Sequence, residues 1–144
     1  MQPQPAGLKI VTVQGTNVQW RCFGGAWSTT PPTQCSNGKL VLRIFLPDCL
    51  QVDANRQPLL DSADHRSHMV DAGSAGCPST HPYPVPRLQT NFQFPMPITR
   101  GKVKLSSDHQ GDPPGSTMHV DFFNAWQEGK LEDLVARCIN AGPL

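Results

Sequence analysis

Apolar and polar positions alternate along several short stretches of the chain, which is the pattern of half-buried β-strands. Two of these stretches, residues 8–13 and 18–22, are separated by Gln14-Gly15-Thr16-Asn17, which has the composition of a turn. We predict that they form a β-hairpin.

Further strands are expected along the rest of the chain. Residues 39–45 place three aliphatic side chains on one face, and residues 87–94 alternate most cleanly, which predicts one buried and one wet face. Shorter strands are predicted around residues 103–105 and over residues 117–123. The long segment 48–86 shows no sustained periodicity, and a loop of that length inside a small domain is usually functional.

Near the C-terminus, apolar residues recur at helical spacing over residues 131–139, and Asn140-Ala141-Gly142-Pro143 is a stop signal. Six strands and one terminal helix predict a mainly β fold. We expect an antiparallel β-sandwich or partly closed barrel with one short C-terminal helix and a long ordered loop. At 144 residues the chain is expected to form a single domain, residues 1–144.

The charge balance argues against two classes of partner. Twelve Lys and Arg residues oppose eleven Asp and Glu residues, so a net charge of +1 provides little attraction to nucleic acid or to an anionic membrane. No run of apolar residues is long enough to cross a bilayer. We therefore expect neither nucleic acid nor a membrane as a partner.

Five cysteines without any CxxC spacing favour structural disulfides in an oxidising, secreted setting. Chain order suggests that Cys22 pairs with Cys35. Cys49, Cys77 and Cys138 share at most one more bridge, and the remaining thiol, if exposed, is a candidate for a disulfide-linked dimer.

Four of the five histidines lie in three short polar clusters. The clusters are Asp64-His65-Arg66-Ser67-His68, Cys77-Pro78-Ser79-Thr80-His81-Pro82 and His119-Val120-Asp121. On a strand, His119 and Asp121 project to one face. If the long loop folds over this face, the side chains suit Zn, Cu or Fe, with His65, His68 and His119 as ligands.

Two other interpretations of the histidines remain open. Without a metal, a histidine beside Asp64 or Asp121 is suited to acid–base catalysis near neutral pH. Alternatively, the histidines are structural and hydrogen-bond an irregular loop. The sequence Asp61-Ser62-Ala63-Asp64 predicts a turn leading into His65. Trp27, in a Gly-rich loop, is a candidate platform for a sugar ring.

Several segments resemble the DUF1996 domain of secreted fungal and actinobacterial proteins. They are Pro5-Ala6-Gly7-Leu8, Trp20-Arg21-Cys22, Phe45-Leu46-Pro47-Asp48-Cys49, the segment from Leu60 to Met69, the segment from Cys77 to Pro82, and His119-Val120-Asp121-Phe122-Phe123-Asn124-Ala125-Trp126. The resemblance implies export, a β-rich domain and a polar site built from the histidine motifs. It supplies no reaction.

The chain departs from the family pattern in two ways. The family usually has a tryptophan directly after the cysteine that corresponds to Cys49, whereas Leu50 stands there in this chain. Full-length members also look to carry an additional N-terminal half with histidine-rich segments of its own. The chain is therefore expected to match the C-terminal half of the domain, either as a naturally minimal version or as a fragment. In the second case an N-terminal half-domain, absent from this chain, is an expected partner.

These observations predict a secreted domain that acts on or binds extracellular polysaccharide through a histidine and aspartate cluster, with metal-dependent cleavage of the glycan as one version. The expected catalytic residues are His65, His119 and Asp121, and the expected substrate-binding residues are Trp27, Asp64 and His81. His65, His68 and His119 would hold a divalent Zn, Cu or Fe ion. The alternative is a non-catalytic glycan-binding or wall-associated module with structural histidines.

Overall fold

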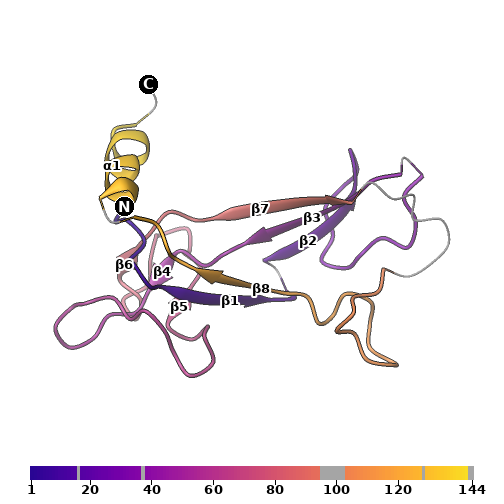
Figure 1. The fold of residues 1–144 in the computed structure, drawn as a ribbon, viewed down its shortest axis with the longest axis horizontal. Coiled ribbons are helices and arrows are strands. Elements are labelled where there is room, and N and C mark those ends of the chain that lie inside the picture. The colour runs from indigo at the N-terminus through magenta and orange to yellow at the C-terminus, as the bar shows by residue number, and fades with distance from the viewer. Residues whose placement is uncertain (16, 37, 95–102, 128, 143–144) are drawn as a thin grey trace. The chain divides into compact units, whose positions relative to one another are not determined.

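The computed structural model describes residues 1–15, 17–36, 38–94, 103–127 and 129–142. This part of the chain is mostly β, with eight strands (Figure 1). They are β1 (Lys9–Val13), β2 (Val18–Cys22), β3 (Leu40–Phe45), β4 (Cys49–Leu50), β5 (Met69–Val70), β6 (Tyr83–Pro84), β7 (Gln89–Phe94) and β8 (His119–Phe123).

The chain divides into two compact units. Unit 1 consists of Met1–Val11, Leu46–Leu88 and Asp121–Leu144, and unit 2 consists of Thr12–Phe45 and Gln89–Val120. Strands β1 and β8 pair with each other, and each contributes residues to both units. The expectation of a single domain stays a prediction.

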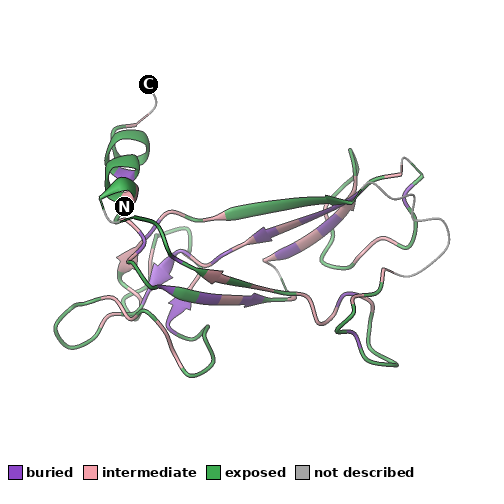
Figure 2. Cartoon of the chain, in the orientation of Figure 1, coloured by how far each residue is buried: buried purple, intermediate pink, exposed green. Residues whose placement is uncertain are grey.

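Unit 2 is built on an antiparallel sheet in the order β2-β3-β7. Leu40, Leu42 and Ile44 alternate along β3 and are all buried, as the sequence predicts. They pack with Val18, Trp20 and the half-cystine Cys35 in one hydrophobic cluster. The purple segments of β2 and β3 in Figure 2 mark this core.

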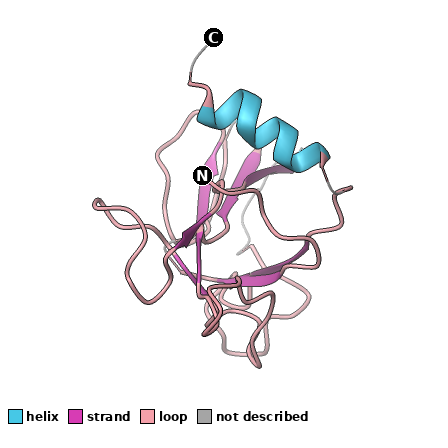
Figure 3. Ribbon diagram, turned by 90° about the vertical axis from the view of Figure 1, so that its left-hand side faces the viewer, coloured by secondary structure: helices cyan, strands magenta, loops and turns pink. Residues whose placement is uncertain are grey.

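Unit 1 holds the segment for which the sequence shows no periodicity. Three two-residue strands form an antiparallel sheet in the order β5-β4-β6, and long loops connect them (Figure 3). Leu50 and Met69 of this sheet are buried with Leu8, Ile10 and Val85 in a second hydrophobic cluster. Strands of two residues are too short for alternation to be visible in the sequence.

The predicted hairpin between residues 8–13 and 18–22 is wrong, although both strands exist. Strand β1 pairs with β8, and β2 pairs with β3. The reason lies in burial, because Ile10 packs into the cluster of unit 1 whereas Val18 and Trp20 pack into that of unit 2. Each strand follows the core that takes its apolar face.

The predicted burial of one face of residues 87–94 is also wrong. Every residue of β7 is exposed, and Phe92 and Phe94 each keep 42% of their surface exposed (Figure 2). Strand β7 stands last in the order β2-β3-β7, and among the described strands it pairs with β3 alone. An edge position leaves the alternating apolar side chains of β7 partly uncovered.

Residues 103–105 form no strand, which corrects a further prediction. Val103 and Leu105 do pack against the core of unit 2. Their backbone instead joins a turn organised by the buried carboxylate of Asp108, which accepts hydrogen bonds from the Leu105, Gly115 and Thr117 amides and from the Thr117 hydroxyl. Gly115 has a φ of +75°, and a Cβ there would lie 2.8 Å from Pro31.

The predicted C-terminal helix is present as α1 (Lys130–Leu134), which continues as a π-helical segment, η1 (Val135–Asn140). Only Val135 of its apolar side chains is buried, whereas Leu134 and Ile139 are more than 40% exposed. Among the described residues no helix has the length and apolar character required to span a membrane.

Two disulfides confirm the expected use of cysteine. Cys22 pairs with Cys35 in unit 2, and Cys49 pairs with Cys77 in unit 1. Cys138 is free and exposed. The mainly β, antiparallel fold class with one short C-terminal helix is also confirmed, and the described strands form no closed barrel.

The Cys49–Cys77 disulfide closes the 28-residue segment that carries the first histidine cluster. Replacing both cysteines with alanine is expected to lower the free energy of unfolding by about 2–5 kcal/mol, because the cross-link restricts the unfolded chain. Denaturant unfolding under non-reducing conditions measures this loss.

Cys138→Ala is the matched control, since it removes an exposed free thiol and is expected to change the free energy of unfolding by less than about 0.5 kcal/mol. Equal stability of the double variant and the control would contradict a structural role for the bridge.

Candidate functional site

The loop from Leu60 to His68 is attached to β1 by its backbone. The Lys9 amide donates to the Leu60 carbonyl at 2.9 Å, and the Val11 amide donates to the His65 carbonyl at 2.8 Å. The loop therefore follows one side of β1 without being a strand itself. Strand conformation begins directly after it, at Met69 of β5. We call residues 60–68 the histidine loop.

His68 is the buried end of this loop. Its side chain has no exposed surface, its Nε2 lies 2.8 Å from the Lys9 carbonyl oxygen, and its Nδ1 lies 2.8 Å from the Ser62 hydroxyl. A carbonyl can only accept, so Nε2 donates to the Lys9 carbonyl. The Ser62 hydroxyl, which has one proton, lies between Nδ1 of His68 and the carboxylate of Asp64. Burial lowers the pKa of His68 below 6.5, in agreement with a neutral ring.

Asp64 shapes the turn between Ser62 and His68. Its Oδ1 atom accepts hydrogen bonds from the amides of Arg66 and Ser67 and lies 2.8 Å from the Ser62 hydroxyl. These hydrogen bonds lower the pKa of Asp64 well below its usual range, with the Ser67 and Arg66 amides as the largest causes. The predicted turn at residues 61–64 is thus present, and Asp64 as a substrate contact stays a prediction.

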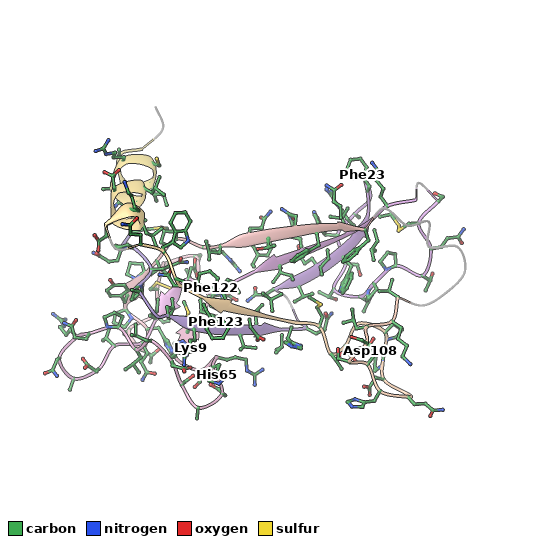
Figure 4. All side chains as sticks on the ribbon, viewed as in Figure 1. Lys9, Phe23, His65, Asp108, Phe122 and Phe123 are labelled. Atoms are coloured by element: carbon green, nitrogen blue, oxygen red, sulfur yellow. A yellow bond between two sulfur atoms is a disulfide. The ribbon has the colours of Figure 1, made fainter. Side chains whose placement is uncertain are left out.

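His65 stands at the exposed tip of the histidine loop with a φ of 55°, in the left-handed region that few residues other than glycine adopt. Its Nδ1 lies 2.5 Å from Oδ1 of Asp61, and Lys9 Nζ lies 3.2 Å from Oδ2 of the same carboxylate (Figure 4). The hydrogen bond from His65 is the largest of the interactions that lower the pKa of Asp61 to about 2.

Nε2 of His65 has no hydrogen-bond partner among the described residues, and about half of the side chain is exposed. A carboxylate therefore holds one nitrogen of the ring while the other is open to solvent. This arrangement suits general acid–base catalysis, because the carboxylate orients the ring and stabilises its protonated form.

His81 joins the same region. Its Nε2 lies 3.1 Å from the Ser67 carbonyl oxygen, and its Nδ1 lies 3.0 Å from the Thr80 hydroxyl. Nε2 thus joins the segment after Cys77 to the histidine loop, whereas Nδ1 contacts the neighbouring residue of its own segment. As a substrate-binding residue, His81 stays a prediction.

The third histidine cluster lies on β8. His119 and Asp121 are exposed, whereas the alternate residues Val120 and Phe122 are half-buried and pack against the two cores, which is the predicted alternation. Nδ1 of His119 lies 3.0 Å from the Thr117 carbonyl oxygen. Their predicted catalytic role stays a prediction.

The predicted metal ligands His65, His68 and His119 do not form a recognisable metal centre. Across the described ranges, no group of three or more His, Cys, Asp or Glu side chains is arranged to hold a metal ion. His68 has hydrogen-bond partners at both ring nitrogens, so it would have to give up Ser62 or Lys9 to bind a metal. The ligand set stays a prediction.

Trp27 lies in unit 2, against the polar face of the β2-β3-β7 sheet. The guanidinium carbon of Arg21 is 4.1 Å from the centre of its ring, and that of Arg43 is 3.8 Å away. Gln19, opposite Arg43 in the sheet register, accepts hydrogen bonds from the Arg43 guanidinium. We call Gln19, Arg21, Trp27 and Arg43 the arginine face.

Beside the arginine face is a hollow of about 290 Å³ between β2 and the loop that follows it. Its lining residues are Trp20, Arg21, Cys22, Gly25, Ala26, Ser28, Thr30, Pro31 and Pro32. Nε of Arg21 and Nε1 of Trp20 are buried donors without a hydrogen-bond partner among the described residues. Buried donors are usually paired, so these two are unusual, and as consecutive residues of β2 their side chains project to opposite faces of the sheet.

The sequence pattern missed several residues of both regions. The pattern predicts only a turn at Asp61 and Ser62, although Asp61 stands four residues before His65 and orients its ring. For Lys9 it predicts only a place in a strand. Arg21 and Arg43 could not be connected with Trp27, because the contacts depend on the pairing of β2 with β3.

These features define the class of protein: a mainly β domain with two disulfides and a histidine-rich loop. Residues 5–126 match the model of the family described as a domain of unknown function, DUF1996. Since the match covers most of the chain, the chain belongs to this family. It does not bear out the expected placement in the C-terminal half of the domain, and no curated protein and no solved structure matches the chain.

The neutral ring of His68 makes the stability of the fold dependent on pH. Because the folded pKa of His68 is lowered, the unfolded chain binds a proton more readily, and stability falls as the pH drops through 6.5 towards the folded pKa. Asp61 and Asp64, whose pKa values are also lowered, add a second loss below about pH 3.8. Denaturant unfolding between pH 7.5 and pH 5 measures the first loss.

His68→Leu is expected to lower the free energy of unfolding at pH 7.5 by about 2 kcal/mol, because it removes the buried hydrogen-bond partner of the Lys9 carbonyl and the contact with Ser62. It should also remove most of the loss between pH 7.5 and pH 5. His109→Leu, at a histidine side chain that is 86% exposed, is the control. A wild-type profile that is flat over this range would contradict the buried neutral ring.

Proposed function

We propose that this domain acts on extracellular polysaccharide, and that the His65–Asp61 pair is its acid–base group. The observation that carries the proposal is the geometry of the pair, in which Asp61 holds Nδ1 of His65 at 2.5 Å and Nε2 is open. In a hydrolytic reaction, Nε2 would accept a proton from the water that attacks the anomeric carbon, and Asp61 would stabilise the resulting imidazolium. As the glycosidic carbon–oxygen bond breaks, the departing sugar oxygen would take up a proton, so that the imidazolium can release its own and the pair is restored.

Other residues around the pair support this role. Asp61, with a pKa lowered to about 2, remains ionised at every pH at which a secreted enzyme is expected to work. Lys9 pairs with the second carboxylate oxygen and so limits the rotation of the Asp61 side chain. Secretion itself is a proposal, with which the two disulfides are compatible.

The test is an assay of released reducing ends on a panel of soluble and insoluble polysaccharides. His65→Asn is expected to lower turnover about 100-fold or more, because it removes the titratable ring while asparagine tolerates the left-handed backbone. Asp61→Asn should lower turnover in the same direction, since it removes the charge that stabilises the imidazolium.

His109→Asn is the matched control, because His109 is exposed and also lies beside a carboxylate, that of Asp112 at 3.2 Å. Full activity of a folded His65→Asn variant would overturn the proposal. The same assay on His119→Ala and Asp121→Asn tests the predicted catalytic role of these two residues.

Chelation distinguishes the metal-dependent version of the proposal. We expect turnover to survive dialysis against a chelator, because the His65–Asp61 pair needs no metal to transfer a proton. Loss of turnover that Zn, Cu or Fe restores, together with near-stoichiometric metal that is absent from His65→Asn, would favour the metal-dependent version instead.

A second candidate function is that of a non-catalytic glycan-binding module that uses the arginine face. The observation that favours it is the polar surface next to Trp27. Asn91 is the register partner of Arg43, and Gln89 and Gln93 lie two residues before and after it on the exposed strand β7, so their amides point to the same face. Amide groups both donate to and accept from sugar hydroxyls.

Retention on insoluble polysaccharide measures this second function. Trp27→Ala is expected to lower retention at least severalfold, because the ring supports both guanidinium groups of the face. His119→Ala and chelator treatment are expected to leave retention unchanged. Retention that depends on His65 or on a metal, but not on Trp27, would contradict a binding role for the arginine face.

A further inference from the structure

The near-zero net charge of the chain conceals an unequal distribution between its units. By sequence, unit 2 contains six Lys and Arg residues and only two Asp residues, which gives a net charge of +4. Unit 1 contains six Lys and Arg residues against nine Asp and Glu residues, which gives −3. The arginine face belongs to the unit with the excess of positive charge.

The two guanidinium groups of this face are close together and are not neutralised. Since both lie against the ring of Trp27, their central carbons are within about 8 Å of each other, where like charges repel. Neither group forms an ion pair with a carboxylate in the described part of the chain, and the partner of Arg43 is the neutral amide of Gln19. Burial, and then the charge of Arg21, lower the pKa of Arg43.

Arg21 also lines the hollow of about 290 Å³ beside β2, and its buried Nε donor has no hydrogen-bond partner among the described residues. A guanidinium group binds a carboxylate or a sulfate through two parallel hydrogen bonds. The arginine face therefore brings two positive charges together beside a hollow, and neither charge is paired with a carboxylate in the described part of the chain.

We infer that the arginine face, with the adjoining hollow, binds an anionic polysaccharide, in which carboxylate or sulfate groups alternate with neutral sugar hydroxyls. The inference rests on the second candidate function above and names its ligand class. Arg21 and Arg43 bind the anionic groups, and the amides of Gln89, Asn91 and Gln93 bind hydroxyls along the neighbouring strand. Trp27 keeps the two guanidinium groups in place.

The same features favour a glycan over a nucleic acid. Single-stranded nucleic acids are bound by stacking of bases on open aromatic rings. The ring of Trp27 is instead in contact with two guanidinium groups, so a ligand that approaches it meets charge. The amide-rich strand β7 beside it offers hydrogen bonds suited to hydroxyls rather than further positive charge.

The experiment measures binding to four probes at physiological salt. Polygalacturonate carries carboxylates, dextran sulfate carries sulfates, dextran is neutral, and a single-stranded oligonucleotide carries phosphates. We expect at least one anionic glycan to bind about tenfold or more tightly than dextran, and the comparison of the first two probes identifies the anionic group.

Matched variants assign the binding to this face. Arg21→Gln and Arg43→Gln are each expected to weaken binding of the anionic glycan about tenfold. Lys104→Gln removes the same charge from an exposed position of unit 2 and should weaken it less than about twofold. Arg43→Lys keeps the charge but lacks the planar pair of donors, so it should also weaken binding of the anionic glycan. This variant replaces Arg43→Gln in the test if Arg43→Gln fails to fold.

Each contrary outcome has a distinct meaning. Equal binding of dextran and the anionic glycans would overturn the inference and leave the glycan-binding function in place. Absence of binding to every glycan would overturn both. If Lys104→Gln weakens binding as much as the arginine variants do, the binding depends on net charge and not on the arginine face, which would overturn the inference. If the oligonucleotide binds more tightly than the glycans and this binding is lost in Arg43→Gln, the face binds nucleic acid instead.

Discussion

The imidazole of His68 is fully buried, and each of its ring nitrogens is hydrogen-bonded to a different segment of unit 1. One bond reaches the backbone of β1 at Lys9, and the other reaches Ser62 inside the histidine loop. Without this side chain, the polar contacts described between the loop and β1 would be two backbone hydrogen bonds and the partly exposed Lys9–Asp61 ion pair. The exposed His65–Asp61 pair therefore has a defined geometry because a second, buried histidine holds the loop that carries it.

Two histidines three residues apart thus have different physical roles. Burial favours the neutral ring of His68, which has a structural role, whereas His65 is about half exposed, with one ring nitrogen held by a carboxylate and the other open. The third interpretation of the sequence, in which the histidines order the long loop, fits the contacts of His68 and His81. It does not account for His65, whose Nε2 binds nothing in the described structure.

Sequence reasoning succeeded where one local signal was sufficient. The alternation in residues 39–45 located β3, the spacing of Cys22 and Cys35 predicted their disulfide, and the motif at residues 61–68 located the histidine loop. It failed where tertiary partners decide the outcome. Pairing of β1 with β8 depends on which core buries Ile10, and exposure of β7 depends on its edge position.

The candidate sites show the same limit. The motif at residues 61–68 identified His65, His68 and Asp64 as candidates. The orientation of His65 by Asp61 could not be predicted, because it depends on the hydrogen bonds of a turn, which the sequence does not show. The arginine face was less predictable still. Arg21 and Arg43 are 22 positions apart and meet at Trp27 only after β2 and β3 have paired.

The left-handed backbone of His65 narrows what selection can place at the tip of the loop. Among residues with a side chain, Asn, Asp and His are the types found most often in this conformation, and His alone of the three exchanges protons near neutral pH. The shape of the turn and the chemistry of the pair therefore constrain one codon together. Replacement of His65 by Asn or Asp would keep the left-handed turn but remove the group that exchanges protons near neutral pH. A single substitution can therefore separate the fold of the loop from its proposed chemistry.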